Sequence, residues 1–155
     1  MFSKTSLQII IVTALISVAI FYMAEFSSKK SEFFEALENE NYVKVEKMLK
    51  NGMNVDAREG VGQTALHKAA YKGNPDLISL LIKYEADINA KDNRGGTPLH
   101  WAIINGRKNN VIALLEAGAD PNIQDAGRMT PAHWAVTALK INNATKNFNI
   151  NLLLE

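Results

Sequence analysis

The chain opens with an unbroken apolar stretch. Residues 7–24 read LQIIIVTALISVAIFYMA and carry no charged side chain. A helix of that length is about 27 Å long, close to the hydrocarbon thickness of a bilayer. Because no polar face runs along such a helix, it has no side to present to water. The pattern predicts an N-terminal hydrophobic helix over residues 1–24 that stands apart from the folded domain.

Two interpretations of residues 1–24 stay open, an uncleaved signal-anchor and a cleaved signal peptide. Cleavage needs small residues at two positions, which Ser17 and Ala19 supply. The mature chain would then begin with the apolar residues 20–23, so we favour the anchor. A buried helix of a soluble protein is the least favoured interpretation.

The charges beside the apolar stretch give two opposing indications of membrane orientation. A short basic head containing Lys4, followed by an apolar run, is typical of an export signal. Lys29 and Lys30 on the other side favour keeping the rest of the chain in the cytoplasm. We give the first indication more weight and expect the folded domain on the exported side, periplasmic or extracellular. Secreted and cytoplasm-facing forms are the alternatives. Residues 25–30 are expected to be a linker.

Beyond residue 30 the pattern changes to a repeat of 33 residues. The tetrapeptides TALH, TPLH and TPAH occupy residues 64–67, 97–100 and 130–133. In each unit a threonine suited to cap a helix precedes a short apolar stripe. Gly106 ends the first helix of its unit, and a second amphipathic stretch and a turn-rich loop follow. Each unit is therefore predicted to be helix, turn, helix and hairpin-like loop.

Short helices of this kind bury their apolar faces only by stacking on neighbouring units. The unit resembles the ankyrin repeat, with TPLH at 97–100, Leu114-Leu115, Gly118-Ala119-Asp120 and Asn122 at the family's positions. The resemblance implies an all-α repeat solenoid, an ankyrin-type stack of about four helix–turn–helix units after the hydrophobic helix. The expected units are residues 31–63, 64–96, 97–129 and 130–155.

The two end units depart from the pattern. In the first, Ser31 stands at the threonine position and Phe34 replaces histidine, with four glutamates nearby, which is typical of a capping repeat. In the last, Leu139 stands where Gly106 would recur, and the apolar residues 152–154 come six residues late. The last unit is either a native cap or an incomplete repeat.

Composition excludes several classes of function. The chain has 17 basic and 16 acidic side chains, and without Lys4 the remaining residues are balanced, so no electrostatic footprint for nucleic acid exists. It has no cysteine, which excludes thiol catalysis and cysteine-ligated zinc. No nucleophile elbow or phosphate-binding glycine loop is present. We expect no cofactor, no metal and no small-molecule substrate.

The histidines are interpreted as structural. Each follows its threonine by three residues, so imidazole and hydroxyl can pair as in a capping box. The resemblance implies that the second ring nitrogen reaches main chain of a neighbouring unit. Like positions of stacked units lie a repeat apart, whereas a metal needs converging ligands. The expected helix-cap residues are Thr64, His67, Thr97, His100, Thr130 and His133.

Binding is expected on the concave surface that repeat stacks present. The expected protein-binding residues are Arg58, Lys68, Tyr71, Lys72, Arg94, Trp101, Ile104, Asn105, Arg128, Met129 and Trp134. Trp101 and Trp134 stand out, because they are the two tryptophans of the chain and lie 33 residues apart. They are either interface residues or half-buried spacers between helix layers. The three arginines are alternatively solvated loop charges.

The sequence therefore favours a non-catalytic protein–protein interaction module, membrane-anchored or exported, with an unidentified protein partner. The first alternative is a soluble secreted effector or immunity-type binder formed by signal cleavage. The second, less favoured, is an enzyme or the regulatory subunit of one, which would need a titratable group with a strongly shifted pKa in a deep pocket.

Overall fold

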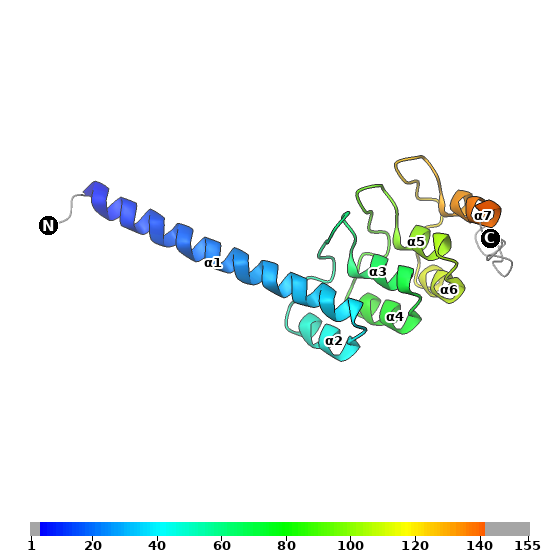
Figure 1. Cartoon of the computed structure of the whole chain (residues 1–155), viewed down its shortest axis with the longest axis horizontal. Coiled ribbons are helices and arrows are strands. Elements are labelled where there is room, and N and C mark those ends of the chain that lie inside the picture. The colour runs from blue at the N-terminus through cyan, green and yellow to red at the C-terminus, as the bar shows by residue number, and fades with distance from the viewer. Residues whose placement is uncertain (1–3, 142–155) are drawn as a thin grey trace.

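The computed structural model describes residues 4–141, which form seven helices and no β-strand (Figure 1). The helices are α1 (Lys4–Glu38), α2 (Tyr42–Lys50), α3 (Ala65–Lys72), α4 (Pro75–Lys83), α5 (Pro98–Ile104), α6 (Lys108–Glu116) and α7 (Pro131–Ile141). The expected all-helical fold, with a hydrophobic helix at its start, is confirmed. The second helix expected near residues 152–154 lies outside the described residues.

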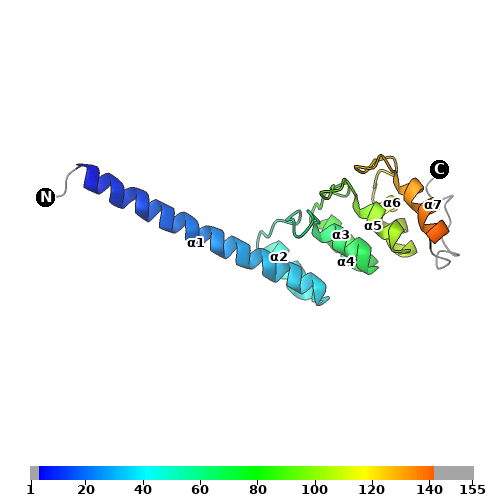
Figure 2. The ribbon, with the colours of Figure 1, turned by 45° about the horizontal axis from the view of Figure 1, so that its top comes forward.

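Helix α1 joins the apolar stretch directly to the first repeat unit (Figures 1 and 2). Residues 25–30, expected to be a linker, continue this helix without a break, because no glycine or proline interrupts it. Ser31, aligned with the capping threonines, consequently lies inside a helix and begins none. The last turns of α1 bury Phe33, Phe34 and Leu37 against the stack.

The repeat units form two layers of helices. Helices α3, α5 and α7 pack in one row, and α4 and α6 pack behind them, as Figure 1 shows. The end of α1 and the helix α2 form the corresponding pair at the start of the row. One continuous core joins the units, from Phe33 in α1 through Leu66 and Leu99 to Ala135 in α7. No unit buries its apolar face alone, as expected for a solenoid.

The loops between units also stack on one another. The main-chain N–H of Asn93 donates to the carbonyl of Val61 over 2.9 Å, and Ala126 donates to Arg94 over 2.8 Å. Gly95 lies at one of these contacts with a φ of +75°, and a Cβ there would meet the main-chain nitrogen of Ala126 at 2.9 Å. The loops therefore form a second ladder beside the helices and hold one edge of the concave face.

Candidate protein-binding surface

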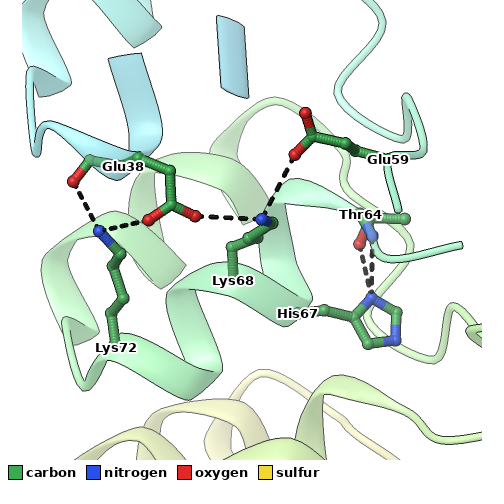
Figure 3. Close-up of polar contacts among 6 residues, drawn as sticks. All are labelled: Glu38, Glu59, Thr64, His67, Lys68 and Lys72. Atoms are coloured by element: carbon green, nitrogen blue, oxygen red, sulfur yellow. Dashed lines mark hydrogen bonds and ion pairs between the residues drawn. The ribbon is translucent and has the colours of Figure 1, made fainter. Parts of the chain in front are cut away.

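The threonine–histidine pairs fix the start of each first helix. The Thr64 N–H donates to Nδ1 of His67 over 3.2 Å, and the Thr64 hydroxyl lies 2.9 Å from the same nitrogen (Figure 3). Nε2 of His67 lies 3.0 Å from the carbonyl oxygen of Gly96, in the next unit. His100 repeats this arrangement with Thr97 and with the carbonyl of Met129 at 3.1 Å. Each of these imidazoles thus joins two units.

The hydrogen bonds also define the protonation state of the two rings. Nδ1 accepts from a main-chain N–H, so the proton of a neutral ring is on Nε2, which donates to the carbonyl. Burial lowers the pKa of His67 and of His100 below the ordinary histidine value. His133 in α7 makes the same contacts with Thr130, but it is exposed. Protonation would put a second N–H against that of the threonine, so the fold favours neutral rings.

Two aspartates anchor the two tryptophans. Nε1 of Trp101 donates to Oδ2 of Asp92 over 2.9 Å, and Nε1 of Trp134 donates to Oδ2 of Asp125 over 2.8 Å. Oδ1 of Asp92 accepts the main-chain N–H groups of Arg94 and Gly96. Each carboxylate therefore fixes a loop and an indole together.

The pKa of Asp125 reflects this anchoring. Partial burial raises it, but hydrogen bonds from the Met129 N–H, the Trp134 indole and the Gly127 N–H outweigh that effect and lower it overall. The carboxylate is consequently held in its charged form. It acts as a fixed acceptor for the Trp134 indole at neutral pH.

A hollow of about 150 Å³ lies between the two tryptophans. We call it the tryptophan hollow; its lining residues are Asp92, Arg94, Gly96, His100, Trp101, Ile104, Asp125 and Trp134. Both indoles are half-buried, so neither is a pure core residue nor a free surface side chain. The loop supplies one wall and the row of first helices supplies the other.

Two exposed apolar residues flank this hollow along the row of first helices. Tyr71 of α3 is 48% exposed, and its ring meets the edge of Trp101 with centroids 6.1 Å apart. Ile104 of α5 is 43% exposed and lines the hollow. The structure thus brings Tyr71, Trp101, Ile104 and Trp134 together, with Arg94 at the loop edge.

Lys68 and Lys72, expected at the binding surface, are held by the first unit (Figure 3). The Glu38 carboxylate contacts Lys68 at 3.0 Å and Lys72 at 2.9 Å, and Lys68 also contacts Glu59 at 3.3 Å. Hydrogen bonds from Lys72 and Lys68 lower the pKa of Glu38. Burial lowers the pKa of Lys68, but its bonds to Glu38 and Glu59 outweigh this and raise it. These lysines connect α1 to α3.

The remaining expected residues lie around the loops. The guanidinium of Arg58 donates to the carbonyls of Gly62 and Lys91, which ties two loops together. Arg94 and Arg128 are exposed, and Arg128 has a φ of +61°. The main-chain groups of Met129 are hydrogen-bonded within the fold, and the Asn105 side chain donates to the carbonyl of Trp101.

Sequence reasoning missed three residues that shape this surface. Asp92 and Asp125 lie 33 residues apart, each nine residues before a tryptophan, and this periodic spacing was the available signal. Asn110 is fully buried in α6, and its amide donates to the carbonyls of Ala69 and Ala70 at the end of α3. No periodic partner marks Asn110, because its equivalent one unit earlier is Leu77.

The apolar part of α1 projects away from the stack (Figures 1 and 2). Within the described residues, one helix is long and apolar enough to cross a membrane, and its apolar window has no share buried in the protein. Two hydroxyls in this segment bond to carbonyls of the same helix, from Thr13 to Ile9 and from Ser17 to Thr13. These polar groups need no water as partners.

Comparison with known proteins agrees with this architecture. A family model of three ankyrin repeats matches residues 33–125, so the chain belongs to the ankyrin repeat family, whose repeats are protein-interaction modules. Over 57 residues, 37% of this chain, it is 42% identical to the inactive serine/threonine-protein kinase TEX14 of Bos taurus. The aligned part is 4% of that protein, so the chain spans a small fraction of its relative's length.

Proposed function

We propose that the chain is a non-catalytic interaction module that binds a protein partner at the tryptophan hollow and its flanking residues Tyr71 and Ile104. The observation that carries this proposal is the pair of half-buried indoles beside two exposed apolar side chains on one face. Tryptophan and tyrosine dominate interface hot spots when they sit in partly desolvated pockets. The cysteine-free sequence and its lack of catalytic motifs support a role without chemistry.

The aspartate anchors explain how such a surface could bind without reorganising. Asp92 and Asp125 fix the indole orientations before a partner arrives, so little side-chain entropy is lost on association. The lysines of α3 are already paired with Glu38 and Glu59. We therefore place the partner on α5, α7 and their loops, with Tyr71 at its edge.

We further propose that residues 7–24 anchor the module in a membrane, with the repeat domain on the exported side. The projecting apolar helix and its internally bonded hydroxyls support the anchor. Anchoring raises the local concentration of the module near a membrane-bound partner. N-terminal sequencing of the mature protein separates an anchor from a cleaved, secreted form, and protease access to a C-terminal tag reports the side.

The binding proposal is tested by affinity capture with the tagged full chain, comparing wild type with Tyr71→Ala/Ile104→Ala. Both side chains are exposed, so the variant should unfold like wild type. We expect the partner's affinity to fall by at least about tenfold, corresponding to about 1.4 kcal/mol. The matched control is Lys108→Ala/Asn109→Ala, two exposed residues at the start of α6. Equal capture by all three proteins would overturn the proposal.

A further inference from the structure

A second surface lies at the junction of the apolar helix with the first repeat unit. A groove of about 870 Å³ runs between α1, α2 and the loop that follows α2. We call it the α1–α2 groove; the lining residues that matter here are Phe26, Lys29, Val43, Lys44, Lys47 and Met53. It faces away from the tryptophan hollow's row of helices, at the start of the stack (Figure 1).

The groove begins where the apolar segment ends. Phe26 follows Ala24 by two residues and Lys29 by five, which places them about 3 and 8 Å further along the helix axis. The headgroup layer on each side of a bilayer is about 5–7 Å thick. Met53, in the loop after α2, lines the same groove as Phe26 and therefore lies near the same level. With residues 7–24 in a membrane, this end of the groove reaches the headgroups.

The side chains at this end combine apolar and cationic groups. Phe26 is 59% exposed and Val43 is 82% exposed, although both are apolar. Lys29 contacts Glu25 loosely at 4.0 Å, and Lys47 has no ion-pair partner among residues 4–141. Lysines close to an anionic bilayer surface are attracted to it, and exposed aromatic side chains are stabilised at the interface.

We propose that the α1–α2 groove binds the headgroups of anionic phospholipids, with Phe26 and Met53 in the interface and Lys29 and Lys47 contacting the negatively charged groups. This inference rests on the proposed membrane anchor. Because α1 continues unbroken into the first unit, such contact fixes the distance of the stack from the bilayer. The Glu38 contacts with Lys68 and Lys72 then transmit that orientation to α3.

The experiment uses the full chain, which has no cysteine, so single cysteines carry nitroxide spin labels without background. Labels are placed at Val18 in the apolar segment, at Asn51 beside the groove, and at Asn109 in α6 as a remote control. The protein is reconstituted in phosphatidylcholine vesicles and in vesicles that also contain phosphatidylserine. Collision of each label with oxygen and with a water-soluble nickel chelate reports its depth.

We expect the Val18 label to be in lipid and the Asn109 label in water in both kinds of vesicle. Phosphatidylserine should reduce collisions of the Asn51 label with the nickel chelate. The variant Lys29→Gln/Lys47→Gln should abolish that reduction, whereas Lys108→Gln should not. Matching thermal unfolding of the labelled proteins shows that each is folded.

The outcomes separate the two proposals. A Val18 label in lipid with an Asn51 label in water in both vesicles overturns lipid binding by the groove and leaves the anchor intact. The same holds for an Asn51 response that ignores phosphatidylserine or the lysine substitutions. A Val18 label in water overturns the anchor and, with it, this inference.

Discussion

Trp101 donates a hydrogen bond from its indole nitrogen to Oδ2 of Asp92, nine residues earlier in the chain, over 2.9 Å. Trp134 and Asp125 repeat the relationship one unit later. The loop between two units therefore determines how an indole on the next helix points. The concave surface is built by loops and helices together, so its shape depends on the loop ladder as much as on the core.

The Asp92 anchor should contribute more to stability than its bond to the indole alone. Asp92→Ala removes the acceptor for two main-chain N–H groups and for Trp101, and we expect a loss of about 2–3 kcal/mol in the free energy of unfolding. Trp101→Phe removes one of these bonds and should cost about 1 kcal/mol through that bond, with a further small loss of packing. Denaturant unfolding measures both. Equal losses would mean that the loop bonds contribute nothing.

Acidification should destabilise the stack through His67 and His100. Their folded pKa values are lowered by burial, whereas an unfolded histidine titrates at about 6.5. Above that pH both states are neutral and stability is constant. As pH falls towards the folded pKa values, the unfolded chain binds protons that the fold rejects, and stability falls by at most about 1.4 kcal/mol per pH unit for each ring.

The pH effect is checked by measuring the free energy of unfolding from pH 7.5 downwards, for wild type and for His67→Gln/His100→Gln. The double variant is expected to be less stable at neutral pH because two inter-unit bonds change. Its stability should nevertheless show a flatter decline just below pH 6.5. A decline identical to that of wild type would exclude these rings as the cause.

Glu38→Gln should weaken the connection between α1 and α3. It removes the charge that contacts Lys68 and Lys72, and because the carboxylate is partly exposed we expect about 0.5–1 kcal/mol. The pKa of Glu38 is lowered in the fold, so this contribution is present above the ordinary glutamate value and is lost as pH falls through the folded pKa. Glu35→Gln is the control on the same helix. Added salt should shrink the difference between the two variants.

Gly95→Ala tests the loop ladder against Gly118→Ala. Both glycines have positive φ, +75° and +94°, so alanine costs about 1–2 kcal/mol of backbone strain at either position. At Gly118 the new Cβ meets nothing within 4 Å, whereas at Gly95 it meets main-chain atoms of Ala126 and Asp125 at 2.9–3.1 Å. Thermal unfolding should therefore show a larger loss for Gly95→Ala. Equal losses would argue against close loop stacking.

The sequence predicted the repeat units well because each carries its own boundary signals. Thr64 and Thr97 precede helices α3 and α5, as their capping chemistry predicts. The prediction was poorer at the first unit, where the alignment of Ser31 with these threonines suggested a helix start. A preceding helix with no breaker simply continues through such a residue, and local capping preference does not stop it.

The candidate site was less predictable than the fold. Trp101 and Trp134 were identifiable from their period, but the alternatives of interface and core could not be separated, since half-burial depends on neighbouring loops. Lys68 and Lys72 were expected at the binding surface. Their pairing with Glu38 depends on where α1 ends relative to α3, which no local pattern encodes.

The most direct test of binding at the tryptophan hollow is site-specific photo-crosslinking in cells that express the full chain. A photoreactive amino acid is placed at Ile104, which lines the hollow, and in a separate variant at Asn109, which is exposed on α6. We predict a discrete adduct with another protein from Ile104, lost when Tyr71→Ala is added, and none from Asn109. Adducts from Asn109 with none from Ile104 would contradict the account.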